Sequence, residues 1–446
     1  MNSLEAPRVY CFGRCFEAPT VGLSGHRPRV EIHSTEGVIL PRLVNGGART
    51  LDSYRATGGY RALDRALESS PEATLEVVDR SGLRGRGGAG FPTGKKWRAA
   101  VREANTPKYL VANADEGDAG AYVDRFLLED DPHVLIEGML LCAHAIGAAH
   151  GWIYLRHEYP AAQLVLERAL AEARDAGLLG KRILGHALDF DLELVVGHGS
   201  YVCGEESALL RSISGLRPEP MARPPYITQS GLFGQPTVMN NVETFANIPW
   251  IVTHGADSYR ALGFSESHGT KVVSLNSLFA KPGLYEVDFG VSVRHIVEEL
   301  GGGLRTGALK GVLIGGPLSG IIPPHLLDTP FGFEELAAIG ASVGHGGVVA
   351  FDEHTSITAL IHHIFSFGAY ESCGKCTPCR LGSRRVEEIF AGIVAGRRAS
   401  STETAEWRDV VNALHWTSLC GHGTGLGAFA ESVLRYYGEE LASCFA

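Results

Sequence analysis

The chain of 446 residues lacks a surplus of positive charge, and its formal net charge is -10. A surface that follows the phosphates of a nucleic acid needs lysine and arginine in clear excess. We therefore expect no nucleic-acid partner. The length allows about two to four domains, each with a substantial core.

Long hydrophobic runs are scarce as well. The most apolar uncharged run, residues 138–155, is just long enough to cross a membrane, but His144, His150 and several small residues interrupt it. We expect instead a buried helix that ends near Ala149 and a strand over residues 152–155. The sequence does not open with a basic region followed by an apolar one, which predicts no signal peptide and no direct membrane insertion. The expected location is the cytoplasm, including the cytoplasmic face of a membrane complex.

Disulfides are not expected either. Nine cysteines without an export signal indicate reduced thiols or metal ligands. Cys142, Cys203 and Cys444 have no motif around them and stay structural or unassigned.

Glycine, in contrast, is concentrated in residues 80–97, where it supplies six of eighteen positions. Such a backbone can lie directly against a ligand, and its successive N–H groups bind phosphate or flavin edges. Arg84, Arg86, Lys95 and Lys96 add positive charge. Residues 95–104 have helical spacing, so the loop leads into a helix N-terminus, a second anion-binding feature. The stretch predicts a nucleotide-phosphate site.

Two familiar nucleotide motifs fit this loop poorly. Gly85, Gly87 and Gly90 satisfy G-x-G-x-x-G, but a predicted helix over residues 73–80, capped by Ser70, precedes them where the fingerprint needs a strand. The P-loop spacing is one residue short, and Lys96 stands where serine or threonine is required. The remaining alternative for residues 80–97 is a flexible surface loop that binds no ligand.

The surrounding sequence alternates between predicted helices and strands, which indicates a layered α/β domain. The helices are expected over residues 50–80, with a break at Gly58 and Gly59, 132–149, 160–176 and 207–214, and the strands over 109–112, 152–155 and 192–196. Polar residues 113–118 follow the first strand, where an α/β sheet presents its ligands. A second glycine-rich turn, 197–206, ends in Glu205 and Glu206, which are either ligand-site carboxylates or an ordinary acidic first helical turn.

After residue 269 the pattern changes. Strands over 270–275 and 311–316 with a helix over 291–300 suggest a small β-grasp-like module, and the chain is predicted to be all-helical beyond Thr355. The expected fold class is a layered α/β domain, a small β-grasp-like domain and a C-terminal helical region, after a short N-terminal segment. The expected boundaries are 1–40, 41–265, 266–340 and 341–446.

Cys373, Cys376 and Cys379 are spaced three residues apart. Cys420 follows them after a stretch of predicted helix, which can bring its thiol back to the other three as a fourth ligand. Three close thiolates and one remote thiolate suit a [4Fe-4S] cluster. Zinc is the alternative, although four-cysteine zinc sites usually consist of two separated pairs. A nucleotide site and a cluster on one chain imply electron transfer, which requires a carrier between two-electron and one-electron chemistry. A flavin is that carrier.

Cys11 and Cys15 form a second, shorter pair near the N-terminus. A two-iron cluster normally needs four thiolates, and no second pair lies nearby. The pair is either half of a degenerate cluster module or two spare thiols.

Together these stretches resemble the NADH-binding flavoprotein subunit of respiratory complex I, a family shared with NAD-reducing hydrogenases and NAD-dependent formate dehydrogenases. The matching residues are 81–97, 113–125, 197–210, 231–244, 371–380 and Cys420. Residues 314–317 and 344–352 look more like the formate dehydrogenase β subunit.

The resemblance implies an FMN site, an NADH site and a [4Fe-4S] cluster. The fold class that it implies is an α/β Rossmann-like flavin/NADH domain, a small β-grasp (SLBB-like) domain and a C-terminal helical bundle that carries the iron–sulfur cluster. Residues 1–40 would be the remnant of a thioredoxin-like module. The implied FMN residues are Gly85, Arg86, Gly88, Lys96, Asn113, Asp115, Gly204, Asn240, Asn241 and Thr244, with Glu205 and Glu206 lining the flavin and nicotinamide pocket. For NADH the implied residues are Phe91 as a stacking partner, Glu116 and Asp118 near the nicotinamide and ribose, and Tyr226 near the adenine. The family carries glutamate, phenylalanine and an aromatic residue at the places of Asp118, Tyr226 and Ala99.

The implied activity is NADH:acceptor oxidoreduction (a diaphorase) by direct hydride transfer, without a side-chain acid or base. Carboxylates would favour NAD over NADP by repelling the 2′-phosphate. The implied partners are a thioredoxin-like [2Fe-2S] subunit and a catalytic subunit that holds the second substrate, such as formate; the alternatives are a complex I or a NAD-reducing hydrogenase context. Two other classes stay open: a Rossmann dehydrogenase, and a non-catalytic binding protein stabilised by metal.

Overall fold

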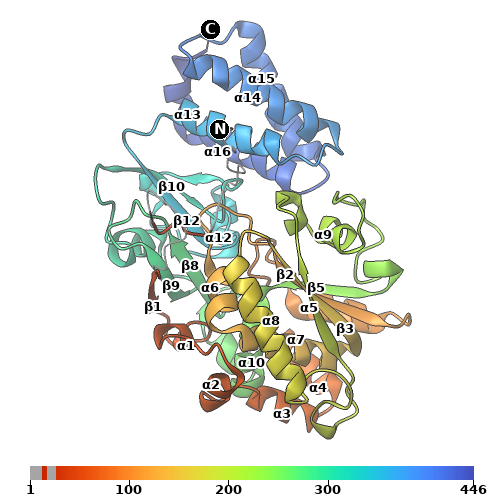
Figure 1. Ribbon diagram of the computed structural model, residues 1–446. Helices are drawn as coiled ribbons and strands as arrows, with labels where there is room; N and C mark the ends of the chain where they lie inside the picture. The colour runs from red at the N-terminus through yellow and green to blue at the C-terminus, as the bar shows by residue number, and fades with distance from the viewer. Residues whose placement is uncertain (1–12, 18–26, 446) are drawn as a thin grey trace, which may run out of the picture.

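The computed structural model describes residues 13–17 and 27–445. Two β-sheets lie side by side below a group of C-terminal helices (Figure 1). Within the described ranges, no helix combines the length and the apolar character that a bilayer crossing requires.

The first sheet has four parallel strands in the order β4-β3-β2-β5. They are β2 (Lys108–Ala114), β3 (Ala148–Leu155), β4 (Asp191–Val196) and β5 (Thr237–Asn241). The predicted α/β alternation is therefore correct. Since all four strands run in the same direction, their carboxyl ends meet at one edge of the sheet, the edge at which such folds bind ligands.

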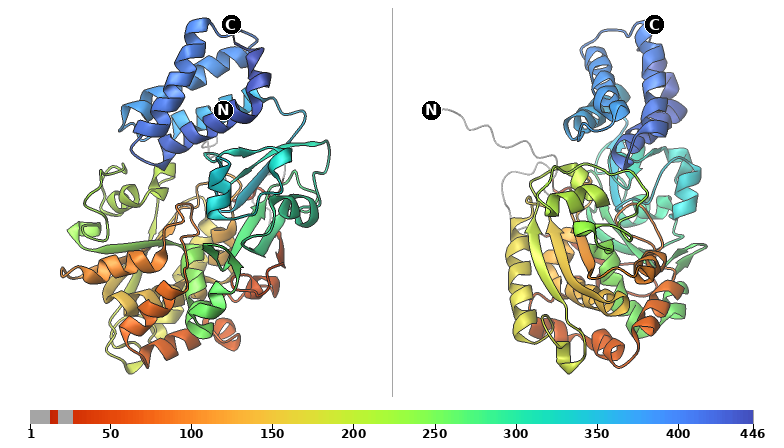
Figure 2. Two further views of the ribbon diagram at one scale, coloured as in Figure 1. Left: turned by 180° about the vertical axis from the view of Figure 1, so that it is seen from behind. Right: turned by 90° about the vertical axis from the view of Figure 1, so that its right-hand side faces the viewer.

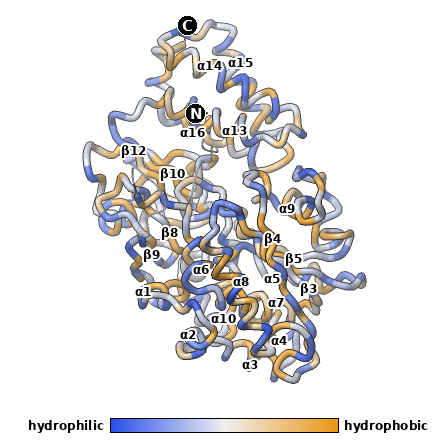
Figure 3. Tube along the Cα trace, in the orientation of Figure 1, coloured by the Kyte–Doolittle hydropathy of each residue, from blue (hydrophilic) through white to orange (hydrophobic). Residues whose placement is uncertain are grey.

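Helices cover both faces of this sheet. One face carries α3 (Arg61–Leu67), α4 (Pro71–Arg80), α5 (Thr93–Arg102), α7 (Pro132–Ile146) and α10 (Val242–His254), with α6 (Val123–Asp130) and α8 (Pro160–Asp175) beside them. On the other face lie α9 (Glu206–Ile213) and the irregular segment that follows it, packed on Val111, Trp152 and Met239. Figure 3 shows hydrophobic stretches along these interior elements and hydrophilic segments in outer loops.

Capping side chains and a glycine determine where several of these helices begin or end. Ser70 caps α4 by accepting a hydrogen bond from Ala73 N at 3.2 Å, and Asn241 caps α10 by accepting one from Thr244 N at 3.1 Å. The helix predicted to reach Ala149 ends at Ile146, because Gly147 takes the left-handed conformation with φ 71°. The strand that follows therefore starts at Ala148 rather than 152.

The second sheet has six strands in the order β1-β9-β8-β12-β10-β11. They are β1 (Arg29–Ile32), β8 (Thr270–Leu275), β9 (Gly283–Asp288), β10 (Leu309–Ile314), β11 (Ile321–Ile322) and β12 (Gly347–Asp352). The predicted boundaries at residues 40 and 340 cut through this sheet, since β1 pairs with β9 and β12 lies between β8 and β10. The helix predicted over 291–300 is a π-helix over His295–Leu300.

Shorter elements connect the two sheets. They are α1 (Pro41–Val44), α2 (Leu51–Ala56), α11 (Ala256–Arg260), α12 (Phe333–Ala338) and the hairpin β6 (Gly263–Phe264) with β7 (Ser267–His268).

From Ile357 to Ala442 the regular elements are all helical, as predicted. They are α13 (Ile357–Tyr370), a π-helical turn (Pro378–Gly382), α14 (Ser383–Val394), α15 (Ser401–Thr417) and α16 (Gly421–Ala442). The helices pack around one core that includes Ile361, Phe390 and Trp407. Figure 2 shows them at one end of the molecule in both views.

The described N-terminal residues 13–17 contact loops beside both sheets. Gly120 N donates to Cys15 Sγ at 3.3 Å, and Ser277 N donates to the Cys15 carbonyl at 2.7 Å. Cys11 lies outside the described residues, so the predicted cysteine pair stays a prediction. None of the eight described cysteines forms a disulfide.

Candidate functional site

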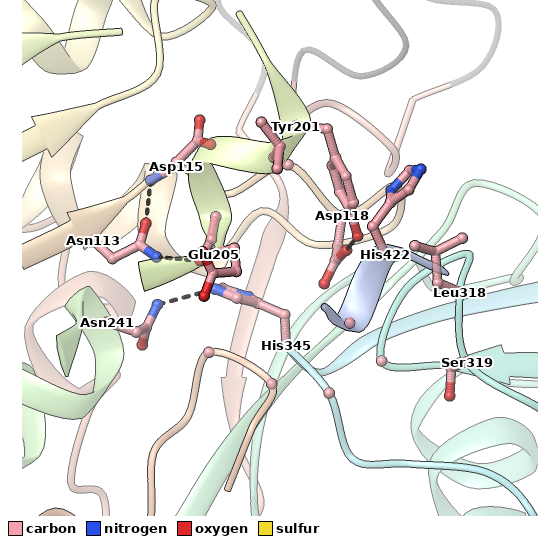
Figure 4. Close-up of a pocket in the computed structure, with 18 of the residues that line it drawn as sticks. Asn113, Asp115, Asp118, Tyr201, Glu205, Asn241, Leu318, Ser319, His345 and His422 are labelled. Atoms are coloured by element: carbon pink, nitrogen blue, oxygen red, sulfur yellow. Dashed lines mark hydrogen bonds between the residues drawn. The ribbon is translucent and has the colours of Figure 1, made fainter. Parts of the chain in front are cut away.

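Two adjoining cavities open at the carboxyl edge of the parallel sheet. The first has a volume of about 290 Å³ and the second about 670 Å³. Both are lined by Gly87, Asn113, Gly204, Glu205, Asn241 and Gly421. Figure 4 shows Asn113 and Asn241, from the ends of β2 and β5, pointing toward the centre of the first cavity. This is the location expected for a ligand of an open α/β sheet.

Most predicted site residues line one cavity or both. The second cavity has Gly85, Phe91, Lys96, Asn113, Gly204, Glu205, Glu206, Tyr226, Asn240, Asn241 and Thr244 on its wall. The first has Gly88, Asp115 and Asp118 in addition to shared residues. Arg86 and Glu116 line neither cavity.

The glycine loop fits tightly against the start of α10. A Cβ atom at Gly87 would lie 2.7 Å from Asn241 Cβ, and Gly88 has φ 129°, which side chains disfavour. Arg86 N donates to Thr244 Oγ1 at 2.8 Å. Gly88 also forms a β-bridge with Gly344, so the loop is held from two sides.

Arg86 points away from the cavities. Its fully buried guanidinium donates to Tyr259 Oη and to the His268 carbonyl, both at 2.8 Å, and lies 4.8 Å from the Phe289 ring centre. The side chain therefore anchors the loop to neighbouring elements, and any contact of Arg86 with a ligand at the cavity would come from its backbone.

Glu116 is also turned inward. Its carboxylate accepts hydrogen bonds from Asp124 N at 3.1 Å, Arg125 N at 3.0 Å and Tyr159 Oη at 3.1 Å. Burial raises its pKa. The residue predicted beside the nicotinamide thus holds the N-terminus of α6.

Glu205 combines the two roles considered for it. Its Oε2 accepts from Ser207 N at 3.0 Å and from Ala208 N at 2.9 Å, which caps α9, while the residue lines both cavities. Arg223 Nη2 lies 2.7 Å from Glu205 Oε1 and 2.8 Å from Glu206 Oε1. Across the second cavity, Lys96 Nζ lies 3.8 Å from Glu206 Oε2, and burial lowers the pKa of this lysine.

Asp115 and Asp118 give the first cavity two half-buried carboxylates. Burial raises the pKa of Asp115 to about 7, and its Oδ2 has no hydrogen-bond partner among the described residues. Asp118 accepts a hydrogen bond of 2.5 Å from Tyr201 Oη, and burial raises its pKa too. An acceptor left unpaired at a cavity suits a ligand with hydroxyl donors. The ribityl chain of FMN has such hydroxyls, and the glycine N–H groups suit its phosphate.

Several cavity residues were not predicted from the sequence. These are Arg223 in the second cavity and Tyr201, Leu318, Ser319, His345 and His422 in the first. Arg223 lies in a proline-rich segment without a motif, and Leu318 and Ser319 follow the predicted strand over 311–316. A signal that could have found His345 is its position between glycines.

The four predicted cysteine ligands converge. Cys373, Cys376, Cys379 and Cys420 line a small pocket of about 10 Å³ together with Ser372, Lys375 and His422. Burial and the three neighbouring cysteines raise the pKa of the Cys379 thiol to about 12. Such thiols become good ligands once a cation replaces their protons. The donor set of four sulfurs fits an iron–sulfur cluster.

The cysteine pocket and the first cavity share a wall. Val202, Cys420 and His422 line both, and Gly421 lines both ligand cavities. A redox ligand in the first cavity would be separated from the sulfurs only by these residues. This arrangement defines the class of flavin- and iron–sulfur-containing electron-transfer proteins.

Comparison with known proteins identifies the family. Residues 78–250 match the Nuo51 FMN-binding domain, and residues 359–444 match the iron–sulfur binding region of NADH-ubiquinone oxidoreductase-F. The chain belongs to this family of NADH-binding flavoproteins, which hold FMN and a [4Fe-4S] cluster. It is an NADH dehydrogenase subunit.

Its relatives belong to two kinds of complex. The chain is 44% identical to HndC, a subunit of the NADP-reducing hydrogenase of Solidesulfovibrio fructosivorans, over 84% of this chain and 76% of the relative. It is 40% identical to the F 2 subunit of the NADH-quinone oxidoreductase of Rhizobium meliloti, over 92% and 97% of the two chains. Among solved structures, an NAD⁺-reducing [NiFe]-hydrogenase in the H₂-reduced state matches with a TM-score of 0.80 and 34% identity, over 93% of this chain and 67% of the other.

Proposed function

We propose that this chain is the diaphorase subunit of a cytoplasmic multisubunit complex and that its two cavities receive the flavin and NADH. The observation that carries the proposal is the wall shared by the first cavity and the four-cysteine pocket. Because of this shared wall, electrons that reach the first cavity would have only a short distance to travel to the cysteine sulfurs.

The residues proposed to hold FMN are those of the glycine loop and of the strand ends. Backbone N–H groups of residues 85–88 and the N-terminus of α10 would bind the phosphate, while Asn113, Asp115 and Asn241 would bind the ribityl and ring edges. When bound, FMN supplies a centre that accepts a hydride and returns electrons one at a time. The protein orients the ligands and shields them from water.

The second cavity supports the proposed NADH site. Phe91 and Tyr226 are 51% and 54% exposed on its wall, and so offer aromatic faces for stacking. Glu205 and Glu206 line the same cavity and give it negative charge, which disfavours the 2′-phosphate of NADP. The proposed preference is NAD over NADP.

The proposed ligands of the [4Fe-4S] cluster are Cys373, Cys376, Cys379 and Cys420. Lys375 and Arg380 lie beside them and would raise the cluster's reduction potential by stabilising the added electron. Zinc is the alternative metal for four thiolates.

The domain assignment is also proposed. Residues 41–265 would form the FMN and NADH domain, the six-stranded sheet an SLBB-like β-grasp module, and the helices after Ile357 a bundle that carries the cluster. Residues 1–40 are proposed as the remnant of a thioredoxin-like module, and β1 within them forms an edge strand of the six-stranded sheet.

The parent complex is proposed to contain a thioredoxin-like [2Fe-2S] subunit and a catalytic subunit. Residues 314–317 and 344–352 favour an NAD-dependent formate dehydrogenase. The relatives named above are NADH-quinone oxidoreductase and hydrogenase subunits, which makes those two complexes the alternatives. Purification of the tagged chain from its own cells, followed by formate-, hydrogen- and quinone-dependent assays, distinguishes the three.

An anaerobic NADH titration of the iron-reconstituted chain tests the activity. We expect the flavin absorbance to bleach and an EPR signal of the reduced cluster to follow. A chain that binds zinc, shows no flavin spectrum and leaves NADH unoxidised contradicts the proposal.

A further inference from the structure

A buried histidine lies in the wall of the first cavity. His345 is 5% exposed and lies in the turn that leads into β12. We propose that His345 is a positioning residue for the flavin nucleotide: as an imidazolium held between Glu116 and Asp124, it fixes Asn241 and the Gly87–Gly88 turn in their ligand-binding arrangement. This inference depends on the proposed flavin site.

The contacts of Nε2 require a proton on that atom. His345 Nε2 lies 2.9 Å from Asp124 Oδ2, which also accepts a hydrogen bond of 2.5 Å from Asn241 Nδ2. Asn241 Nδ2 and His345 Nε2 lie 3.0 Å apart, and both point at the same carboxylate oxygen (Figure 4 shows the asparagine and the histidine meeting). Two donors therefore share one acceptor.

The surroundings of Nδ1 favour a second proton, and this nitrogen has no hydrogen-bond partner among the described residues. Nδ1 lies 3.4 Å from Glu116 Oε1, and the Glu116 carboxylate already accepts three hydrogen bonds. An unprotonated Nδ1 would direct its lone pair at a carboxylate oxygen, whereas N–H attracts it. Burial lowers the pKa of His345, but Asp124 and Glu116 outweigh burial and raise the value to about 9. The two carboxylates thus favour the imidazolium form of His345 at neutral pH.

This cation connects four segments of the fold. Glu116 follows β2, Asp124 lies in α6, Asn241 ends β5, and His345 precedes β12. Two of the segments touch the glycine loop, because Asn241 packs against Gly87 and Gly344 bridges to Gly88. Loss of the charge would leave Glu116 and Asp124 facing each other and would release both supports of the loop.

Other charged groups near His345 are already paired or are acidic. Lys271 pairs with Glu243, whose backbone N–H donates to Asp124 Oδ1 at 3.2 Å, and Asp118 lies in the same cavity. Lys271 lowers the pKa of His345, and the carboxylates raise it. Deprotonation of His345 would therefore add net negative charge beside a site proposed to bind a phosphate.

A divalent metal is the alternative occupant. Glu116, Asp124 and His345 offer ligand atoms that all lie within 4.8 Å of one another. However, the oxygens of both carboxylates already accept hydrogen bonds, from the three donors on Glu116 and from Asn241 and Glu243 N on Asp124. A metal would have to displace these donors. The geometry favours a proton.

The test measures FMN affinity of the apoprotein by quenching of flavin fluorescence between pH 6.5 and 9.5. His345→Gln keeps an amide donor but removes the charge. We expect the variant to bind FMN about tenfold more weakly at pH 7, the size of one charged hydrogen bond. Because the protonated form of His345 is the one that supports the ligand, the ratio of the two affinities should fall toward one as pH rises through 9.

A matched control and a second variant keep the result interpretable. His133 is a fully buried histidine beside Glu172 and lines neither cavity, so His133→Gln should leave the pH profile unchanged. Asp124→Asn removes one carboxylate beside His345, which should lower the pKa of the imidazole and move the pH-dependent loss of affinity to lower pH. This shift is measurable even if His345→Gln does not fold.

Three outcomes overturn the inference. They are equal affinities of wild type and His345→Gln, a ratio that does not change with pH, and stoichiometric zinc binding that depends on His345. If the wild-type apoprotein itself does not bind FMN, the proposed function fails instead.

Discussion

Arg223 Nη2 lies 2.7 Å from Glu205 Oε1, and the same nitrogen contacts Glu206. The two carboxylates that should exclude NADP are thus partly neutralised from within the cavity. Arg223 is 41% exposed, so water screens this contact and the ion pair leaves some negative field at the wall. In the proposed function, the balance among these three charges would set the preference between NADH and NADPH.

Replacing Glu205 with glutamine should weaken the discrimination between NADH and NADPH. The amide retains an acceptor for the cap of α9 but no longer repels the 2′-phosphate, so the ratio of kcat/KM values should shift toward NADPH by roughly tenfold, or about 1.4 kcal/mol. Steady-state kinetics with an artificial acceptor measure this ratio. Arg223→Gln is the opposite control, because it exposes both carboxylates and should increase the preference for NADH.

Cys379→Ser should remove the cluster but not the flavin. One missing thiolate leaves three ligands for four iron sites, whereas the cavity wall contains Cys420 and none of the other three cysteines. We expect iron per chain to fall and NADH still to bleach the flavin. Cys444→Ala, at a free cysteine outside the cysteine pocket, should retain its iron. Retention of four irons per chain by Cys379→Ser would refute the ligand assignment.

Asp115→Asn should stabilise the apoprotein at high pH. Burial raises the pKa of Asp115 to about 7, so the folded state prefers the protonated form and loses stability as pH rises from the unfolded pKa toward 7. At pH 8 the variant should gain roughly 1–3 kcal/mol, and at pH 3, where the carboxyl is protonated in both states, the gain should vanish. Thermal unfolding at the two pH values measures this, and FMN affinity should fall because the unpaired acceptor is lost.

Gly88→Ala should change the conformation of the glycine loop, and thus lower FMN binding, more than it lowers the stability of the fold. With φ 129° at this position, a Cβ atom meets no neighbour but imposes backbone strain of about 1–3 kcal/mol. We expect a lower FMN occupancy. Gly180→Ala is the matched control, since Gly180 has φ 102° and equally open space but lies outside both cavities. Equal FMN loss in both variants would argue against a special role for the loop.

Local patterns predicted the features that depend on neighbouring residues in the chain. The glycine loop, the cap at Ser70 and the spacing of Cys373, Cys376 and Cys379 follow directly from the order of residues. Cys420 was predicted as the fourth ligand from its residue type and from the predicted helical stretch between it and the other three cysteines. These features arise from backbone freedom, side-chain capping and metal-ligand chemistry.

Features that depend on contacts between residues far apart in the sequence were either not predicted or predicted with the wrong surroundings. The pairing of β1 with β9 brings together residues about 250 apart and has no local signal. The family resemblance assigned Arg86 and Glu116 to the ligand site, and in the structure their side chains contact interior partners. Arg223 and His345 became candidates only when their neighbours were known.

The position of β12 constrains how the protein matures. This strand, between β8 and β10, follows directly after His345, and the first cavity also needs Cys420 and His422 from near the end of the chain. A nascent chain that has released only its first 340 residues from the ribosome therefore has an open sheet and an unfinished cavity. We accordingly expect the proposed cofactor to bind late, after the chain is complete rather than after its first domain has folded.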